Sequence, residues 1–448
     1  MGRLFGTDGV RGVANTELTA ELAYRLGRAG AYVLTRGKQN AKIVVGKDTR
    51  ISGDMLEAAL VAGILSVGGN AIRVGVVSTP GVAYLTRTLG ADAGVMISAS
   101  HNPVADNGIK FFGGDGFKLL DQAEEEIESL LQGEDRMPRP VAGDIGRVED
   151  RSDAVSLYID YLRTTIPNRF DGLKVVLDCG NGAAFHIAPE VFRALGAEVI
   201  AINSQPNGVN INVKCGSTYP DVVREAVLQH SAAIGLSFDG DADRLIAVDE
   251  KGQLVDGDYV MAILGRSLKA AGELAKDTIV TTVMSNVGFV KAARELGIEL
   301  VRTAVGDRYV MEAMREGGYV LGGEQSGHII MLRHNTTGDG ILTAIQLTNV
   351  LVAEGKPLSE LRSIMRSYPQ VLVNVRVGSK EGWDQNENIK HAIRKVEEEL
   401  GDEGRVLVRP SGTEPLIRVM AEGPDQDQVQ EYVDSIANVV RKELGALQ

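Results

Sequence analysis

One structural plan recurs three times along the chain. An apolar strand is followed by a polar, glycine-containing loop, an amphipathic helix that ends near a glycine, and a second strand, in residues 42–77, 173–203 and 278–305. Strands this apolar, joined by helices, are typical of parallel sheets covered on both faces. The helices are expected to end at Gly68, Gly196 and Gly297, because glycine readily adopts the left-handed C-cap conformation. The repeat therefore predicts three related α/β domains with mixed or parallel sheets.

The last part of the chain follows a different plan. After the helix-stopping residues 355–357 (GKP), strand and helix patterns alternate over residues 370–448 and predict a compact α+β domain. Its final helix carries one apolar stripe, made of Val429, Val433, Ile436 and Val440. We therefore expect four domains, with bounds at 1–155, 156–254, 255–369 and 370–448.

Charge and cysteine content exclude several classes of protein. The 448 residues carry a net charge of −13, which argues against a nucleic-acid partner but not against small anionic ligands. No apolar run reaches the roughly 18 residues of a membrane span, and the first residues lack the apolar core of a signal peptide. Two cysteines, Cys179 and Cys215, fit a reducing compartment. We therefore expect a cytoplasmic protein with neither membrane nor nucleic-acid partners.

A polar turn, SASHNP, follows the apolar strand that ends at residue 97. Open α/β sheets bind ligands at the carboxyl ends of their strands, so Ser98 and Ser100 stand where a catalytic group is expected. Strand alternation places both on one face and does not separate them. The alternative is a purely structural turn, in which Pro103 holds Asn102 extended.

Three aspartates alternate along the stretch SFDGDADRLIAVDE. Around Gly240, a loop can turn Asp239, Asp241 and Asp243 onto one hard cation. An EF-hand calcium loop has similar acidic spacing, but its sixth position requires Gly and here holds Arg244. Both flanks also resemble strands rather than helices. We therefore predict a Mg²⁺ site that leaves coordination positions free for a phosphate oxygen.

Two further motifs suit the binding of a sugar phosphate. In RPSGTEPLIR, Arg409 and Arg418 can grip an oxyanion in bidentate fashion, with hydroxyl and backbone donors between them. In GGEQSGH (322–328), Glu, Gln, Ser and His side chains on a glycine-flanked loop suit hydrogen bonding to a polyol. Each motif taken alone is equally consistent with an ordinary surface turn.

A serine, a Mg²⁺ cluster, an oxyanion clamp and a polyol-reading loop together predict phosphoryl transfer on a sugar phosphate. The sequence has neither a Walker A motif nor a G-x-G-x-x-G fingerprint, so no nucleotide is predicted. Two alternatives remain. A metal-dependent sugar phosphatase would pass the phosphoryl group to water, and a Ca²⁺-binding module would use only the aspartate spacing.

Five motifs occur in the order found in the α-D-phosphohexomutase superfamily: GTDGVRG (6–12), SASHNP, DGDADR, GEQSGH and RPSGTEP. The chain resembles that superfamily over its whole length. Within it, the chain resembles the bacterial phosphoglucosamine mutases, because Gln325 stands where phosphomannomutase-like relatives typically have Met. The resemblance implies four domains around a central cleft. It also implies interconversion of glucosamine 6-phosphate and glucosamine 1-phosphate, which feeds UDP-N-acetylglucosamine and cell-wall synthesis.

The resemblance also implies a role for each motif residue. The family's phosphoserine directly precedes His-Asn-Pro, which makes it Ser100, with His101 and Asn102 supporting it. The implied Mg²⁺ ligands are Ser100, Asp239, Asp241 and Asp243, and Arg244 follows their loop. The implied handlers of protons and charge are Arg11, Lys110 and His328. The implied sugar readers are Glu324 and Ser326. The implied phosphate clamp consists of Arg409, Ser411, Gly412, Thr413 and Arg418.

The implied reaction passes through a glucose or glucosamine 1,6-bisphosphate, which also serves as activator. Phospho-Ser100 gives its phosphoryl group to the sugar, and the turned bisphosphate returns the other one. A general base is needed for the sugar hydroxyl, and the choice among His328, Lys110 and Arg11 stays open. Lys110 qualifies only if its pKa is lowered. The implied partners are small sugar phosphates, and a homodimer is left open.

Overall fold

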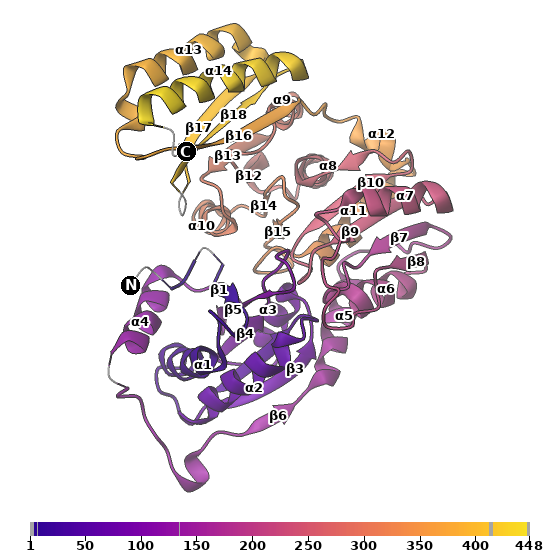
Figure 1. The fold of residues 1–448 in the computed structure, drawn as a ribbon. Coiled ribbons are helices and arrows are strands. Elements are labelled where there is room, and N and C mark those ends of the chain that lie inside the picture. Colours follow the sequence, from indigo (N-terminus) through magenta and orange to yellow (C-terminus); the bar gives the residue numbers. More distant parts are fainter. Residues whose placement is uncertain (1–3, 7, 134, 412–414, 446–448) are drawn as a thin grey trace. The chain divides into compact units, whose positions relative to one another are not determined.

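The computed structural model describes residues 4–6, 8–133, 135–411 and 415–445 (Figure 1). By internal packing, the described residues form two units. The first unit comes from Met1–Val283 and Ile298–Ser363, and the second from Met284–Gly297 and Ile364–Gln448.

The first sheet of unit 1 has six strands in the order β1-β5-β4-β2-β3-β6. The central strands β2, β3 and β4 and the edge strand β6 run parallel. At the other edge, β5 pairs antiparallel with β4, and β1 pairs antiparallel with β5. The strands are β1 (Val10–Val13), β2 (Lys42–Lys47), β3 (Asn70–Val76), β4 (Ala93–Ile97), β5 (Asp106–Gly113) and β6 (Val148–Asp150).

Helices connect these strands and build the core. The helices are α1 (Ala20–Leu34), α2 (Ser52–Leu65), α3 (Thr79–Thr88), α4 (Asp121–Gln132) and α5 (Val155–Thr164). The Ser78 hydroxyl caps α3 by accepting the N–H of Gly81 at 3.2 Å, and Pro80 occupies the first turn. α1 and α2 pack against each other, and α3 packs on β2 and β4. The cap fixes where α3 starts, close to the aspartate loop of the second sheet, because the N–H of Thr79 donates to the Asp241 carbonyl at 3.0 Å.

The second and third sheets repeat the parallel centre on a smaller scale. The second sheet has the order β11-β10-β9-β7-β8 and the third has the order β13-β12-β14-β15. The second-sheet elements are β7 (Lys174–Asp178), β8 (Glu198–Ile202), β9 (Ile234–Phe238), β10 (Leu245–Asp249), β11 (Leu254–Val255), α6 (Ala184–Ala194) and α7 (Pro220–His230). The third-sheet elements of unit 1 are β12 (Thr278–Thr282), β13 (Glu299–Thr303), β14 (Leu321–Gly323), β15 (Ile329–Met331), α8 (Gly257–Ala270), α10 (Asp307–Gly317), α11 (Gly340–Glu354) and α12 (Leu358–Arg362).

Unit 2 contains an antiparallel three-stranded sheet in the order β16-β18-β17. Its elements are α9 (Val287–Glu295), β16 (Gln370–Arg376), α13 (Glu387–Leu400), β17 (Arg405–Pro410), β18 (Leu416–Glu422) and α14 (Gln426–Leu444). The predicted apolar stripe of α14 is buried against β16 and β18, as expected for an amphipathic helix that covers a sheet.

The predicted fold class is confirmed: three α/β sheet regions precede a C-terminal α+β region. The three glycines expected at helix ends have φ values of +87° (Gly68), +100° (Gly196) and +65° (Gly297). The one refinement is that each of the first three sheets has antiparallel strands at an edge, so the sheets are mixed. Among the described residues, no helix is both long and apolar enough to cross a membrane.

Candidate active site

Ser100 lies in a left-handed turn directly after β4. Its φ is +52°, so the chain changes direction and strand alternation no longer applies. Ser98 Oγ donates to Asp48 Oδ2 at 2.7 Å and accepts the N–H of Ser100 at 2.9 Å. Ser100 Oγ instead donates to Asp239 Oδ2 at 2.6 Å and lies 3.3 Å from His101 Nδ1. The structure thus separates two serines that the sequence pattern did not: Ser98 braces the turn, and Ser100 faces the aspartates.

A buried ion pair holds the backbone of this turn. Arg50 Nε lies 3.0 Å from Asp48 Oδ2, and both side chains are fully buried. The Arg50 guanidinium donates to the carbonyls of Ser100 at 3.0 Å and Asn102 at 2.8 Å. Asn212, which precedes α7, donates to the Ser100 carbonyl at 2.8 Å. Because these carbonyls point to fixed donors, the backbone itself positions the Ser100 hydroxyl.

The three aspartates lie in the loop of the antiparallel hairpin β9–β10. Carboxylate oxygens of Asp239, Asp241 and Asp243 lie within 4.8 Å of one another, and all three residues are buried. Gly240 permits the approach of the two loops, because a Cβ there would stand only 2.5 Å from the carbonyl oxygen of Ser100. Strands β9 and β10 flank the loop, as predicted. An EF-hand would require a helix on each side.

The chemistry of these aspartates fits a hard divalent cation. Asp241 Oδ1 and Asp243 Oδ1 are buried with no hydrogen-bond partner within the described part of the chain. Buried carboxylate oxygens are costly unless a cation or water satisfies them. Burial, together with the neighbouring Asp243 and Asp241, raises the pKa of Asp239 well above its ordinary value. Three converging carboxylates are ligands that Mg²⁺ prefers, and they leave positions open for the Ser100 oxygen or a phosphate.

Lys110, on β5, bridges the aspartate loop to the first sheet region. Its Nζ lies 2.8 Å from Asp241 Oδ2 and 2.8 Å from Asp8 Oδ2. Burial alone would lower the pKa of Lys110, but Asp241 and Asp8 outweigh it, so the pKa is raised. The lowered pKa that would suit Lys110 as a general base is therefore not found, and the residue is a fixed cation.

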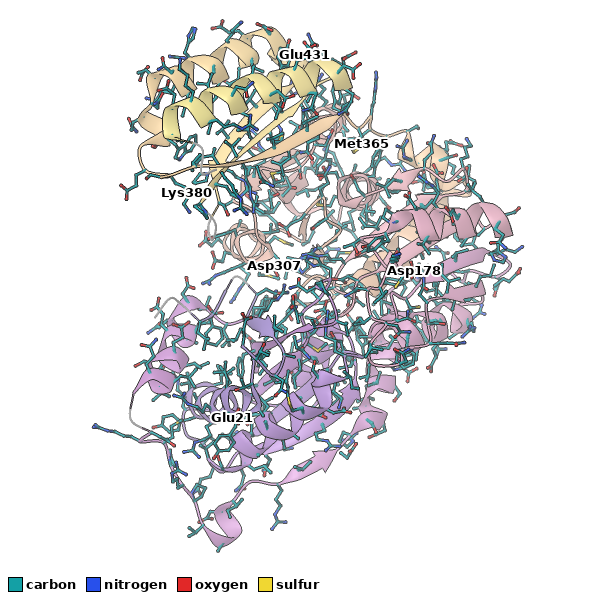
Figure 2. All side chains as sticks on the ribbon, in the orientation of Figure 1. Glu21, Asp178, Asp307, Met365, Lys380 and Glu431 are labelled. Atoms are coloured by element: carbon teal, nitrogen blue, oxygen red, sulfur yellow. The ribbon has the colours of Figure 1, made fainter. Side chains whose placement is uncertain are left out.

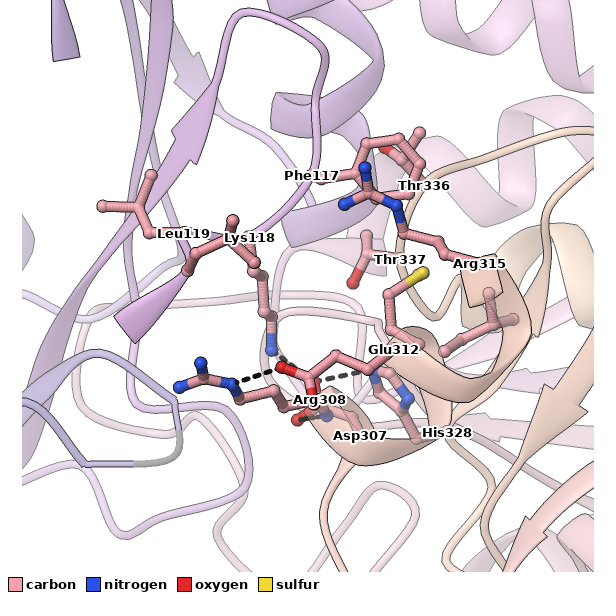
Figure 3. A pocket seen from close by; sticks show the side chains of 13 residues that line it. Phe117, Lys118, Leu119, Asp307, Arg308, Glu312, Arg315, His328, Thr336 and Thr337 are labelled. Carbon is pink, nitrogen blue, oxygen red and sulfur yellow. Dashed lines mark hydrogen bonds and ion pairs between the residues drawn. The ribbon is translucent and has the colours of Figure 1, made fainter. Parts of the chain in front are cut away.

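The alternation of charge continues through a second lysine. Lys118 Nζ lies 2.6 Å from Asp8 Oδ1 and also binds Asp307, at the start of α10. His328 Nε2 lies 3.6 Å from Asp307 Oδ2 and 3.6 Å from Asp243 Oδ2. Figure 3 shows the side chains of Lys118 and His328 both pointing toward Asp307. We call this series the charge chain; it consists of Asp241, Lys110, Asp8, Lys118, Asp307, His328 and Asp243.

The predicted sugar-binding loop lies between β14 and β15 and is tied to the aspartate hairpin. The N–H of Leu245 donates to the carbonyl of Gly327 at 3.0 Å. Gly327 has φ +92°, and a Cβ there would stand 2.1 Å from the Leu245 carbonyl oxygen. This close approach brings His328 to the aspartates. Glu324 Oε1 accepts the N–H of Gly306 at 3.1 Å, and Ser326 is exposed.

Three further predicted residues surround Ser100 and the aspartates. The N–H of Arg244 donates to Asp239 Oδ1 at 3.2 Å, and Arg11 pairs with Asp8. Burial and the cations Arg244 and Arg11 lower the pKa of His101 to about 4. His101 is therefore neutral near pH 7, and its Nδ1 can accept a hydrogen bond from the Ser100 hydroxyl.

The predicted phosphate clamp lies in unit 2. Arg409 on β17 is paired directly opposite Arg418 on β18. Neither guanidinium has an ion-pair partner among the described residues, and Arg418 Nε is buried without a hydrogen-bond partner there. Burial and the adjacent Arg418 lower the pKa of Arg409.

The next predicted clamp residue, Ser411, is buried, and Lys380 donates to its carbonyl at 2.7 Å. Two unpaired neighbouring guanidiniums suit an oxyanion; Gly412 and Thr413 lie outside the described residues.

Sequence reasoning missed three members of the charge chain: Asp8, Lys118 and Asp307. Asp8 had a signal, because it lies inside the GTDGVRG motif, three residues before Arg11. Lys118 and Asp307 had none, because each is a single charged residue in an ordinary polar context. Their meeting joins residues 189 apart in the chain, which no local pattern reports.

Models of the phosphoglucomutase/phosphomannomutase family match the chain in four places. Alpha/beta/alpha domain I matches residues 2–137, domain II matches 156–252, domain III matches 256–368, and the C-terminal domain matches 372–439. These matches follow the same order as the three α/β regions and the C-terminal α+β region of the structure.

Relatives of known name match over nearly the full length. The phosphoglucosamine mutase of Brevibacillus brevis is 60% identical over 99% of this chain and 100% of its own length, and that of Bacillus subtilis is 57% identical over 99% and 100%. Among solved structures, a phosphoglucomutase/phosphomannomutase family protein from Burkholderia thailandensis shares the fold, with a TM-score of 0.83 at 24% identity over 99% of this chain and 98% of that one. Aspergillus fumigatus N-acetylphosphoglucosamine mutase, in complex with GlcNAc-6P and magnesium, has a TM-score of 0.68 at 18% identity over 98% and 95%. The chain therefore belongs to the phosphoglucomutase/phosphomannomutase family and resembles bacterial phosphoglucosamine mutases over its whole length.

Proposed function

We propose that this chain interconverts glucosamine 6-phosphate and glucosamine 1-phosphate, the reaction for which its curated relatives are named. It is a phosphohexomutase, an isomerase that moves a phosphoryl group within a sugar phosphate. The observation that carries the proposal is the contact of Ser100 Oγ with Asp239 Oδ2, at 2.6 Å, inside a buried group of three aspartates. A serine hydroxyl held against a cation site is what a phosphoserine carrier requires.

Two transfers at Ser100 account for the net reaction. In the first, the bond between phosphorus and Ser100 Oγ breaks, and the free hydroxyl oxygen of the sugar monophosphate bonds to phosphorus. The product is the 1,6-bisphosphate, which turns in the site. In the second transfer its other phosphoryl group returns to Ser100 Oγ, and the isomeric monophosphate leaves. Glucose or glucosamine 1,6-bisphosphate would act as activator, because it restores phospho-Ser100.

A Mg²⁺ ion held by Asp239, Asp241 and Asp243 would neutralise charge on the transferring phosphoryl group. The protein's own cations add to this effect. Lys110 remains charged between two carboxylates, and Arg11 lies beside Asp8. Arg244 approaches Asp239 through its backbone N–H. These fixed charges require no reorganisation as the phosphoryl group moves.

We propose His328 as the group that takes and returns the proton of the sugar hydroxyl. Lys110 is unsuited to this role, because it is a buried cation between Asp241 and Asp8. His328 Nε2 lies 3.6 Å from Asp243 Oδ2 and from Asp307 Oδ2, and neither ring nitrogen has a hydrogen-bond partner in the described part of the chain, so the imidazole is available to accept a proton. His101 and Asn102 are assigned to holding the turn that carries Ser100, and neither is assigned to proton transfer.

The sugar and its second phosphate are assigned to separate loops. Glu324 and Ser326 would bind sugar hydroxyls, which fits the position of their loop next to His328. Arg409, Ser411 and Arg418, together with Gly412 and Thr413, would hold the phosphate that is not reacting. We place the four functional domains at 1–155, 156–254, 255–369 and 370–448, which is supported by one family match within each range. The cytoplasm, where amino-sugar precursors of the cell wall are made, is the proposed location.

Mass spectrometry combined with an isomerisation assay tests the proposal. The purified protein should carry one phosphoryl group on the peptide that contains Ser100, and it should convert glucosamine 6-phosphate into glucosamine 1-phosphate in the presence of Mg²⁺. Release of inorganic phosphate in place of the isomer would identify a phosphatase and would overturn the proposal. The absence of any modification at Ser100 after incubation with glucose 1,6-bisphosphate would do the same.

A further inference from the structure

Asp307 lies beside the proposed sugar-binding loop, yet it is not part of the aspartate cluster. Asp307, labelled in Figures 2 and 3, begins α10. The preceding residue, Gly306, donates its N–H to Glu324 Oε1 at 3.1 Å. Its side chain is 15% exposed and contacts Lys118 and His328. Asp307 is thus a carboxylate next to the sugar reader Glu324, and the three cation-binding aspartates do not require it.

The charges around Asp307 leave it able to accept a second cation. Asp8 forms ion pairs with three cations, Lys110, Lys118 and Arg11. Asp307 shares Lys118 with Asp8, and the only other basic side chain in ion-pair distance of it among the described residues is His328. If another cation approached Asp307, Lys118 would keep its 2.6 Å contact with Asp8. Although burial would raise the pKa of Asp307, Lys118 and His328 outweigh it and lower the pKa, so the carboxylate stays ionised.

Space for a small group exists next to this carboxylate. A pocket of about 40 Å³ is lined by Lys118, Asp307 and His328, by the charged residues Arg308, Glu312 and Arg315, and by threonine and apolar side chains (Figure 3). A single water requires roughly 10–15 Å³ on the same measure, and an ammonium group is of similar size. Lys118 already places one ammonium against Asp307, which shows that the carboxylate is oriented to accept this kind of donor.

We propose that Asp307 determines the preference for an amino sugar by accepting a hydrogen bond from the C2 ammonium of the substrate. This inference rests on the proposed function and adds the source of its substrate specificity. A charged donor gains from an ionised acceptor in a partly buried site, whereas the C2 hydroxyl of a glucose phosphate gains much less. Lys118 moves its share of the interaction to Asp8 when the substrate binds.

The test compares kcat/KM for glucosamine 6-phosphate and glucose 6-phosphate in wild type, Asp307→Asn and Asp307→Glu. Asp307→Asn should reduce the preference for the amino sugar on the order of tenfold or more, the worth of a charge-assisted hydrogen bond. Both substrates should lose whatever rate the contact of Asp307 with His328 contributes. Glucosamine 6-phosphate should lose more, chiefly through a higher KM. Asp307→Glu should retain part of the preference. Glu316→Gln, an exposed carboxylate on the same helix, is the matched control and should leave the preference unchanged.

A preference that is unchanged in Asp307→Asn would overturn the inference. Equal losses for both substrates would also overturn it, because they would indicate that Asp307 acts only through His328. Wild-type protein provides a second measurement that needs no variant to fold. Its preference should fall as the pH rises through the pKa of the substrate amine, about 8 by analogy with an α-amino group. A preference that is constant from pH 6.5 to 9.5 would contradict the inference, whereas wild type that fails to isomerise glucosamine 6-phosphate would refute the proposed function itself.

Discussion

Two regions of this molecule are proposed to bind phosphate, and their charged residues are arranged in opposite ways. Around Ser100, acids and bases alternate along the charge chain, and every cation in it contacts at least one carboxylate. On β17 and β18, Arg409 and Arg418 stand side by side with no acidic partner among the described residues. The first arrangement combines four carboxylates with two lysines and a histidine, whereas the second places two guanidiniums next to each other.

The difference fits the role proposed for each region. A phosphoryl group in transfer passes between two oxygens, so its surroundings must stabilise changing charge without trapping either state; alternating fixed charges achieve this. A phosphate that is only held requires net positive charge and no more. The comparison predicts that damage near Ser100 affects mainly kcat, whereas damage on β17 and β18 affects mainly KM.

The largest effect is expected from Ser100→Ala. Without the hydroxyl there is no phosphoryl carrier, so kcat for isomerisation should fall at least about a thousandfold, which corresponds to roughly 4 kcal/mol of barrier. A coupled assay of glucosamine 1-phosphate formation measures the loss. Ser98→Ala is the matched control: it removes a hydroxyl two residues away that braces the turn, so the protein should still take up a phosphoryl group. If Ser100→Ala kept more than a thousandth of the wild-type rate, another residue would be the carrier.

Asp241→Asn should have the next largest effect. It removes one of three converging charges and leaves Lys110 with Asp8 as its remaining close carboxylate. We expect kcat to fall on the order of a hundredfold at limiting Mg²⁺, with partial recovery in excess Mg²⁺. Titration of activity with Mg²⁺ measures both quantities. Activity equal to wild type at limiting Mg²⁺ would mean that the aspartates serve structure alone.

Arg418→Ala tests the other side of the comparison. One of two neighbouring guanidiniums is lost, so KM for the sugar phosphate should rise by roughly tenfold, with a smaller fall in kcat. A bisphosphate held less firmly should also escape more often, which raises both the free bisphosphate per turnover and the requirement for added glucose 1,6-bisphosphate. Steady-state kinetics with product analysis provides the numbers. A fall in kcat with KM unchanged would place Arg418 with the transfer chemistry and break the comparison.

The smallest expected effect is a loss of stability at acidic pH. His186 and His334, both in unit 1, have pKa values lowered chiefly by burial. Because the folded pKa lies below the ordinary value near 6.5, the unfolded chain binds protons that the folded chain does not, and stability falls as the pH drops below about 6.5. His186→Gln should therefore lose less melting temperature than wild type between pH 7 and pH 5. Circular dichroism melts at both values measure the difference, and parallel losses would show that His186 does not contribute.

Much of the fold follows from local sequence signals. Glycines at helix ends and apolar runs of strand length act within a few residues, so the repeat, the C-terminal region and the stripe on α14 were all predictable. The aspartate loop was predictable for the same reason, because its three acids and both flanking strands occupy one short stretch. The order of the family motifs then implied a role for each motif residue, and those roles stay predictions.

What the sequence did not disclose depends on contacts between distant segments. The charge chain joins residues from all three sheet regions of unit 1, and a single lysine such as Lys118 carries no sign of its two acidic partners. The choice between Ser98 and Ser100 was likewise hidden from strand alternation. It depends on a left-handed φ at Ser100 and on donors from Arg50 and Asn212, which lie 50 and 112 residues away.

The charge chain also has a consequence for synthesis of the protein. Lys118 and Asp307 are separated by 189 residues, and ribosomes add about 5–20 residues each second. Roughly 10–40 seconds therefore pass between the appearance of the lysine and that of its second carboxylate. During this interval the serine turn and the aspartate hairpin can already form, but the imidazole of His328 is absent. A chain cut short before the third sheet thus contains Ser100 and the three aspartates without Asp307 and His328, so the charge chain cannot be completed in it.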